Sequence, residues 1–425
     1  MVERFKLVKN KKNNLRKGII KTVFGEIQTP FFMPDATRGY VKSVSMEDLE
    51  KVGVSPMVVN TLHLYLQPGI DVIKSVKSVK AKVAEGVHSF MSWSHPLISD
   101  SGGFQVFSLI YKKSGMGKIY DDKVVFKSPI DGSRHIFTPE KSIQIQFDLG
   151  TDMIVCLDDC PPNEFNKDCV KKSVERTIKW AKKCRKEYNR QIKKRKLKNS
   201  KRPLLFSVIQ GGNFKDLRKY CADELVKIGF DGYGFGARPV DENGNRLEDI
   251  LEYTAGLIPE NALRFALGVG TPEDIIKCVS YGWDMFDCVI PTREARHGKL
   301  FLGKTSNLCH SRESGNPVLN TRISKNGSRS SRFGQSEADI KCGMTVFEQF
   351  GINGVKKFYD TININNAKFS KDFSAINENS KLPELRNHTK AYLHHLFKMK
   401  ESLGSRLASL NNLEFYMDLM DNIRK

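Results

Sequence analysis

Three aspartates in this sequence are associated with short apolar segments of the kind that form buried strands. Asp100 begins the segment Asp-Ser-Gly-Gly-Phe-Gln, Asp158 ends the segment Met-Ile-Val-Cys-Leu-Asp, and Asp287 follows Met-Phe. Burying a carboxylate beside a core is costly unless it has a partner, so these positions favour ligand binding. Carboxylates that share a site can carry out substitution at an anomeric carbon, where one attacks the carbon and another moves a proton.

Basic side chains accompany the last of these aspartates. Arg293 and Arg296 lie just downstream of Asp287 and are suited to hold anionic groups. Structural interpretations of the aspartate motifs remain open, because Asp-Ser-Gly-Gly alone can be a turn and Asp158 with the aspartate after it can be a cap.

The elements that would position these residues are short apolar segments, each followed by a turn and a longer amphipathic stretch. Eight such segments occur, at 29–33, 56–61, 96–100, 153–158, 204–210, 232–237, 263–269 and 285–289. Helical patterns between them include 45–52, 139–149, 213–229, 247–257 and 271–282. The alternation predicts the α/β class and a closed (β/α)8 TIM barrel rather than an open sheet. The polar strand ends would then meet on one face, where barrel enzymes keep their chemistry.

The remaining parts of the 425-residue chain differ from this pattern. We expect residues 1–304 to form the barrel and residues 305–357 to be a partly disordered insertion, because 311–341 is rich in Ser, Arg, Asn and Gly. An apolar stripe with helical spacing predicts C-terminal helices over 386–425 that pack on the barrel.

The composition favours a cytoplasmic protein with a polyanionic partner. No window approaches the roughly 18 apolar residues of a membrane helix, the N-terminus lacks a signal-peptide pattern, and nine cysteines without a CxxC pair predict reduced thiols. The net charge is +21, and the segment 171–202 alone holds 16 basic and two acidic residues. That segment is a solvated helix face, a surface for nucleic acid, or both.

Several motifs in order carry a resemblance to the tRNA-guanine transglycosylase (queuine tRNA-ribosyltransferase) family of bacterial type, over residues 4–304 and 386–424. They are VNTLHLYLQPG at 59–69, DSGGFQVFSL at 100–109, DGSRHIFTPEKSIQIQ at 131–146, QGG at 210–212, LGVGTPEDI at 267–275, FDCVIPTREARHGKLF at 286–301 and AYLHHL at 391–396. The resemblance implies a pentosyltransferase that replaces guanine at the wobble position of tRNA with a GUN anticodon by a 7-deazaguanine base, on the route to queuosine. It also implies a homodimer.

The resemblance assigns roles residue by residue. Asp287 is expected to attack ribose C1′ and hold the tRNA covalently, and Asp100 to act as general acid and base. Arg293 and Arg296 are expected to bind tRNA. A flipped base needs aromatic stacking and groups that read its edge. The residues expected to bind the base are Asp158, Gln210, Ala237, Phe104, Leu267 and Ser101, with Phe104 stacking on it and Leu267 forming the opposite wall.

One departure concerns the zinc site of the family, Cys-x-Cys-x-x-Cys with a distant His, of which residues 358–385 would be the remnant. The cysteine positions fall on Ser380, Leu382 and Leu385, and the histidine position falls on Asn411. None of these is a good zinc ligand, so we expect no metal and no cofactor.

A second departure lies after the sixth predicted strand, where the family has Gly-Gly-Leu-Ala and this chain has Gly-Ala-Arg-Pro at 236–239. Pro239 offers no amide N–H, and Arg238 would repel a cationic base if it pointed inward. Cys160 and Val240, in contrast, match relatives that take the small aminomethyl precursor, preQ1. We favour preQ1 over queuine, because an Arg can turn toward solvent while a β-branched Val cannot vacate its space.

Two other hypotheses stay open at this point. The missing zinc ligands and the insertion suggest a non-catalytic or decayed tRNA-binding paralogue, against which Asp100 and Asp287 are retained. A barrel glycosidase that reads only sugars would also use paired carboxylates, but it would not need the basic charge.

Overall fold

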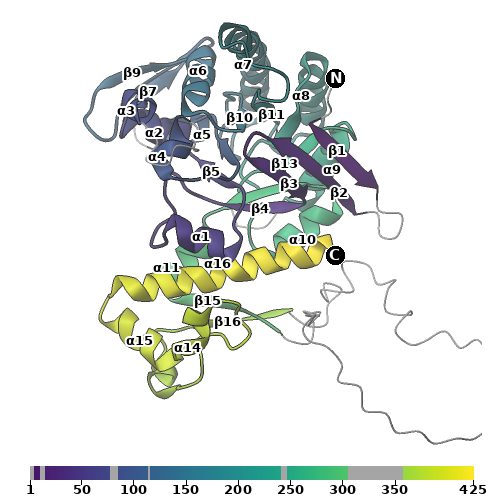
Figure 1. Cartoon of the computed structure of the whole chain (residues 1–425). Coiled ribbons are helices and arrows are strands. Elements are labelled where there is room, and N and C mark those ends of the chain that lie inside the picture. Colours follow the sequence, from purple (N-terminus) through teal and green to yellow (C-terminus); the bar gives the residue numbers. More distant parts are fainter. Residues whose placement is uncertain (1–3, 10–14, 77–84, 113–114, 241–246, 305–357) are drawn as a thin grey trace, which may run out of the picture.

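The computed structural model describes residues 4–9, 15–76, 85–112, 115–240, 247–304 and 358–425. The predicted insertion, 305–357, lies outside these residues. The centre of the molecule is an eight-stranded, all-parallel sheet with the order β4-β14-β13-β12-β11-β10-β6-β5 (Figure 1). Its strands are β4 (Phe31–Pro34), β5 (Met57–Val59), β6 (Leu97–Ser99), β10 (Met153–Val155), β11 (Leu204–Ile209), β12 (Gly232–Phe235), β13 (Leu263–Ala266) and β14 (Met285–Cys288).

The two edge strands of this sheet meet and close it into a barrel. Asp35, just after β4, forms a parallel bridge with Val58 of β5. The Ala36 N–H donates to the Val58 carbonyl at 2.7 Å, and the Asn60 N–H donates to the Thr37 carbonyl at 3.1 Å. Each barrel strand overlaps one of the eight predicted segments, so the predicted (β/α)8 barrel is confirmed.

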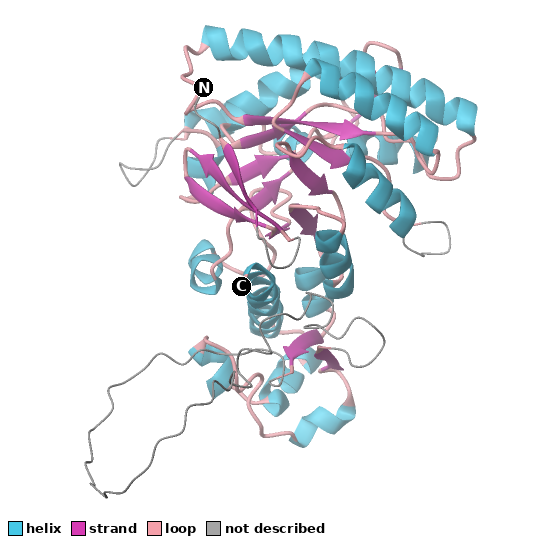
Figure 2. Ribbon diagram, turned by 90° about the vertical axis from the view of Figure 1, so that its right-hand side faces the viewer, coloured by secondary structure: helices cyan, strands magenta, loops and turns pink. Residues whose placement is uncertain are grey.

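Helices follow the barrel strands and cover their outer side (Figures 1 and 2). They are α1 (Met46–Val52), α2 (Thr61–Leu66), α3 (Ile70–Ser75), α4 (Val87–Met91), α5 (Gly103–Lys112), α6 (Pro139–Leu149), α7 (Lys167–Lys194), α8 (Lys215–Ile228), α9 (Glu248–Leu257), α10 (Pro272–Ser280) and α11 (Ile290–Arg296). Three of the predicted ones begin at capping side chains, Ser45, Thr138 and Thr271, which accept hydrogen bonds from backbone N–H groups of the first turn. Pro139 and Pro272 occupy the first helical position, where no N–H is required.

Helix α7 contains most of the strongly basic segment. Val174, Ile178, Ala181 and Tyr188 are buried on one side of it, as the helical spacing predicts. Many of its Lys and Arg side chains remain exposed. The amphipathic interpretation of the basic segment is therefore confirmed, and a role in binding nucleic acid remains a prediction.

A small antiparallel sheet packs against the amino end of the barrel. It consists of β1 (Phe5–Lys9), β2 (Arg16–Thr22) and β3 (Gly25–Thr29). Phe5, Ile20 and Ile27 of this sheet belong to the same buried cluster as Met153 and Leu204, the first residues of β10 and β11. The opposite end of the barrel, where the strands finish, is the one that carries the predicted polar residues.

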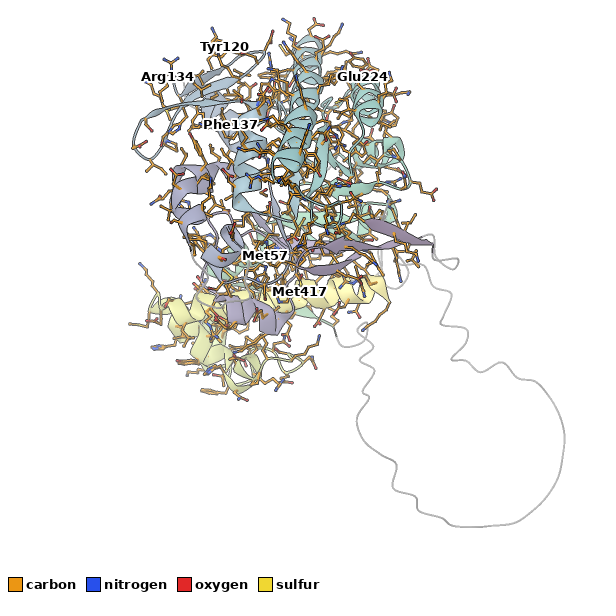
Figure 3. The ribbon with its side chains drawn as sticks, turned by 45° about the horizontal axis from the view of Figure 1, so that its top comes forward. Met57, Tyr120, Arg134, Phe137, Glu224 and Met417 are labelled. Atoms are coloured by element: carbon orange, nitrogen blue, oxygen red, sulfur yellow. The ribbon has the colours of Figure 1, made fainter. Side chains whose placement is uncertain are left out.

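Another three-stranded sheet lies between α5 and α6 in the sequence, formed by β7 (Gly117–Ile119), β8 (Val124–Lys127) and β9 (Arg134–Phe137). Tyr120 and Arg134 lie at its outer edge, whereas Phe137 is buried toward the body of the protein (Figure 3). Among the described residues, no helix is both long and apolar enough to cross a membrane.

The C-terminal part begins with β15 (Lys299–Gly303), which pairs antiparallel with β16 (Tyr359–Asn363). The short helices η2 (Ala367–Lys371), α14 (Pro383–Asn387) and α15 (Lys390–Lys398) follow, and then the long helix α16 (Ser402–Arg424) passes along the barrel (Figure 1). Arg406 of α16 forms a bidentate ion pair with Asp48 at 2.6 and 2.8 Å, and the Tyr416 hydroxyl donates to the Gly270 carbonyl at 2.7 Å. Met417 packs on the buried cluster that contains Met57 of β5 (Figure 3).

Candidate active site

A cavity of about 590 Å³ opens at the carboxyl ends of the barrel strands. Asp100, Asp287 and Arg293 line it. Every residue predicted to bind the base lines it as well, namely Asp158, Gln210, Ala237, Phe104, Leu267 and Ser101. The barrel thus brings together side chains that are as far apart in the sequence as Asp100 and Arg293.

Asp287 is in β14, one residue before the strand ends. The Gly268 N–H donates to its Oδ1 at 2.9 Å, and this is the one hydrogen bond that the described residues make to the carboxylate. Burial raises the pKa of Asp287 to about 7, an effect that the Gly268 N–H opposes and the nearby charge of Asp35 reinforces. A carboxylate with few hydrogen bonds is poorly solvated, which keeps it reactive toward an electrophilic carbon.

Asp100 follows β6 and is held by four donors. The backbone N–H groups of Thr61 and Gly102 donate to Oδ1 at 2.9 and 3.1 Å, and the side-chain amides of Asn60 and Gln105 donate to Oδ2 at 2.5 and 3.1 Å. Burial nevertheless raises its pKa to about 7. A group that titrates near neutral pH can both give and take a proton, which is what a general acid and base must do.

Asp158 and Gln210 form a polar pair in the lining of the cavity. Gln210 Nε2 donates to Asp158 Oδ2 at 2.7 Å, and burial raises the pKa of Asp158 to about 7. Ser101 Oγ lies 3.5 Å from Asp158 Oδ1. Gln210 Oε1 is buried and has no hydrogen-bond partner among the described residues. A bound ring with N–H donors on its edge would satisfy this oxygen, because buried acceptors are costly to leave unpaired.

The two consecutive aspartates after β10 have different surroundings. Asp159 makes an ion pair with Arg176 of α7, and its backbone N–H donates to Thr177 Oγ1 at 3.0 Å. Of the two aspartates, Asp158 is the one in the cavity lining. The structural interpretation therefore holds for Asp159, and the ligand-binding interpretation is left to Asp158.

Phe104 and Leu267 supply apolar surface to the cavity. Phe104 is in the first turn of α5 and is 52% exposed, which is unusual for a large aromatic side chain next to a core. Leu267 follows β13 and packs on the cluster inside the barrel. Both line the cavity, so a planar ring can be placed against apolar groups there.

The loop after β12 shapes one side of the cavity and contains the second departure from the family pattern. Asn163 Nδ2 donates to the carbonyls of Arg238 and Val240 at 3.1 and 2.7 Å, which anchors the loop. Arg238 lines the cavity together with Cys160 and Val240, and it is also exposed. Ala237 has a φ of 138°, a conformation that favours glycine and costs about 1–3 kcal/mol for other residues.

Two arginines of α11 lie next to the cavity. Arg293 lines it, and half of its side chain is exposed. Arg296 is one turn further along the helix and outside the lining; burial and then the charge of Arg293 lower its pKa. Two cations that are close enough to repel each other are suited to an anion such as a phosphate.

The residues at the positions of the family zinc site do not fit a zinc ion. Leu382 and Leu385 are buried in the apolar cluster of the C-terminal part. Ser380 Oγ donates to Glu414 Oε2 at 2.6 Å, and Asn411 Nδ2 donates to the Phe301 carbonyl at 2.9 Å. In the described ranges, no cluster of three or more His, Cys, Asp or Glu side chains could hold a metal. Structural zinc requires thiolate and imidazole ligands, and this set offers apolar packing and hydrogen bonds instead.

Sequence reasoning assigned no role to several residues of the cavity wall. Asn60 and Gln105 hold Asp100, Gly268 holds Asp287 through its backbone, and Asp35 adds a carboxylate. Asp35 follows the predicted strand 29–33, so the rule that located Asp100 would have located it also, whereas Asn60 was placed at a strand end but given no role. A backbone donor such as Gly268 leaves no signal in residue type.

Comparisons with known proteins give one consistent result. A sequence model of the family described as Queuine tRNA-ribosyltransferase matches residues 11–425. A protein of that name from Thermoanaerobacter pseudethanolicus is 38% identical over 423 residues, which are 99% of this chain and 92% of the relative. Proteins of the same name from Halothermothrix orenii and Staphylococcus aureus are 38% and 36% identical over 409 and 415 residues. These alignments span 96% and 98% of this chain and 89% of each relative.

Proposed function

This chain belongs to the queuine tRNA-ribosyltransferase family and is a tRNA-guanine transglycosylase, and we propose that it exchanges the base through a covalent bond between Asp287 and ribose C1′. The observation that carries the mechanism is the convergence of Asp100, Asp158 and Asp287 in one cavity at the carboxyl end of the barrel.

In the first step, a carboxylate oxygen of Asp287 forms a bond to C1′ while the bond from C1′ to guanine breaks. The departing guanine takes a proton from Asp100, so that it leaves as a neutral base. In the second step, the incoming base loses a proton to Asp100 and attacks C1′, and the ester to Asp287 breaks. Two inversions at C1′ restore the original stereochemistry, and both aspartates return to their starting states.

Other residues of the same cavity hold the base. Gln210 and Asp158 supply acceptors and a donor for its edge, and Phe104 and Leu267 supply apolar surface for its faces. An edge read by hydrogen bonds and a stacked ring are the features that select a base taken out of a nucleic-acid stack.

For the incoming base, we propose the cationic aminomethyl precursor preQ1 over queuine. Val240 and Cys160 line the cavity and limit its size. Arg238 lines the cavity as well, but it is exposed, so its cation can be solvated at the cavity mouth. The negative charges of the cavity attract a cationic base.

The other partner is tRNA with a GUN anticodon. Arg293 and Arg296 are proposed to bind phosphates beside the wobble nucleotide, and the exposed cations of α7 are proposed to raise the local concentration of tRNA. The resemblance to the family further supports a cytoplasmic homodimer. The protein is proposed to work without zinc, because the positions of that site hold Ser380, Leu382, Leu385 and Asn411.

Incubation with unmodified tRNA and radiolabelled guanine tests the activity. Label should enter tRNA in the presence of the wild-type protein, and it should not enter with Asp100→Asn, which cannot transfer the proton. A protein that binds tRNA but incorporates no label would be a non-catalytic relative, and the proposal would be wrong.

A further inference from the structure

Asp35 is a fourth carboxylate of the cavity, and neither the proposed exchange nor the proposed base contacts use it. It follows β4 directly, and its side chain lines the cavity together with those of Asp287, Asp100 and Asn60. Among the described residues, Thr37 alone makes a hydrogen bond to it, and the Thr37 hydroxyl donates to Oδ1 at 2.5 Å. Because a carboxylate accepts about four hydrogen bonds, the group has capacity left for a ligand.

The order of the strands around the barrel divides the cavity into two arcs. Four of the proposed base contacts, Asp158, Gln210, Ala237 and Leu267, follow the consecutive strands β10, β11, β12 and β13. The other two, Ser101 and Phe104, follow β6, which is the neighbour of β10. The other arc runs through β14, β4, β5 and β6, whose ends carry Asp287, Asp35, Asn60 and Asp100 in that order. Asp287 and Asp100 therefore stand at the two ends of the second arc, and Asp35 lies between them.

Local contacts agree with this order. Met33 pairs with Asp287 between β4 and β14, so Asp35 is only two residues beyond the strand partner of Asp287. Burial is the main cause of the raised pKa of Asp287 and of Asp100, and the negative charge of Asp35 contributes to the rise at both. Asp35 is thus within electrostatic range of the proposed nucleophile and of the proposed acid.

The bond that breaks during exchange joins the base to C1′, and it must lie within reach of Asp287 and Asp100. A base held mainly by the first arc would leave its ribose over the second arc, which contains Asp35. In a nucleotide inside an RNA chain, the 3′ and 5′ oxygens are esterified, so the 2′-hydroxyl is the one free hydroxyl of the sugar. That hydroxyl is on the carbon next to C1′ and on the ring face opposite the base, which is the face that the nucleophile approaches.

We propose that Asp35 accepts a hydrogen bond from the 2′-hydroxyl of the wobble nucleotide and thereby selects RNA over DNA at this position. The inference rests on the proposed attack of Asp287 at C1′. A 2′-hydroxyl is the group by which a protein distinguishes RNA from DNA at a given nucleotide. A hydrogen bond to this hydroxyl also strengthens as C1′ becomes positive in the transition state, so the contact favours the reaction as well as binding.

The test compares three tRNAs: an all-ribose tRNA, one with a single 2′-deoxyguanosine at the wobble position, and one with a single deoxynucleotide on the 5′ side of it. The kcat/KM for exchange of labelled guanine is measured for each. For the wild-type protein, the wobble deoxynucleotide should lower kcat/KM by about tenfold to a hundredfold, the range expected for a hydrogen bond to a charged group. The neighbouring deoxynucleotide should change it by less than about threefold, as expected for a group without a direct contact.

Two substitutions of Asp35, combined with the deoxynucleotide in the tRNA, give a double-mutant cycle. Asp35→Ala should lower kcat/KM on the all-ribose tRNA by a similar factor and lose most of the discrimination against the wobble deoxynucleotide, because the two changes remove the same contact. Asp35→Asn removes the charge but keeps an acceptor oxygen, so its discrimination should fall between those of Ala and the wild type. It provides the comparison if the Ala variant does not fold.

Equal rates of the wild-type protein on the two deoxy-substituted tRNAs would overturn the inference. So would full discrimination retained by Asp35→Ala or Asp35→Asn. No exchange by the wild-type protein on the all-ribose tRNA would instead overturn the proposed function, and this inference with it.

Discussion

Gln105 Nε2 donates a hydrogen bond to Asp100 Oδ2 at 3.1 Å, from the first turn of the helix that follows the Asp-Ser-Gly-Gly motif. This bond favours the ionised form of Asp100, and it opposes the burial that raises the pKa of Asp100 to about 7. Gln105 therefore positions the proposed acid and base and adjusts the pH at which it works.

Gln105→Leu should shift the pH dependence of exchange toward higher pH. Loss of one donor to the carboxylate destabilises its ionised form by about 1 kcal/mol, which corresponds to roughly 0.7 pH unit. A pH–rate profile of kcat measures the shift. Gln144→Leu is the control, because Gln144 donates to Glu187 instead, at 3.0 Å. A profile that moves equally in both variants, or moves toward lower pH in Gln105→Leu, would contradict the assignment of Asp100.

How far the sequence predicts this site depends on the kind of signal. Asp100, Asp158 and Asp287 were predictable, because each is near the carboxyl end of an apolar strand and a barrel brings such ends together. The different surroundings of Asp158 and Asp159 were not, because they depend on Arg176, which reaches Asp159 from a neighbouring helix. Asp35 was overlooked because the predicted strand stopped before Pro34, although the same rule applies to it.

Asp158→Asn should stabilise the protein at pH 8 and lose that advantage on acidification. The pKa of Asp158 is about 7 in the folded protein and 3.8 in the reference state, so the folded state binds the extra proton between these values. The contribution of Asp158 to the free energy of unfolding is fully present below about pH 4 and is lost as the pH rises through about 7. Replacement by a neutral amide removes the loss, which amounts to roughly 1–4 kcal/mol at pH 8.

Thermal melting at pH 8 and pH 5 checks this linkage. Asp159→Asn is the matched control, because Asp159 is paired with Arg176 and its loss leaves this cation with the exposed Asp121, at 3.5 Å, as its remaining acidic partner. The control should lower the melting temperature at both pH values. If Asp158→Asn melts at a lower temperature than the wild-type protein at pH 8, burial does not destabilise the ionised form of Asp158.

The purified protein should contain no stoichiometric zinc, and chelators should leave its melting temperature unchanged. Leu382 and Leu385 stabilise the C-terminal part by packing, so Leu385→Ala should cost about 2–5 kcal/mol of unfolding free energy. Elemental analysis and melting with and without a chelator provide the measurements. One zinc per chain would contradict the prediction.

Binding of tRNA should weaken steeply as salt rises, because Lys and Arg contacts to phosphates release counterions. Arg293→Ala should reduce the slope of log affinity against log salt by about one, since one phosphate contact is lost. Lys21→Ala, on the small sheet that packs at the amino end of the barrel, should leave the slope unchanged. A salt-independent affinity of the wild-type protein would remove the argument for basic recognition of tRNA.

The covalent ribosyl intermediate is tested most directly by trapping it. Wild-type protein mixed with end-labelled tRNA should give a band of protein bound to tRNA that survives denaturing electrophoresis. Asp287→Asn should give no such band and no base exchange while still binding tRNA, because an amide cannot form the ester. A denaturation-resistant adduct with Asp287→Asn, or exchange by this variant at the wild-type rate, would contradict the assignment of Asp287 as the nucleophile.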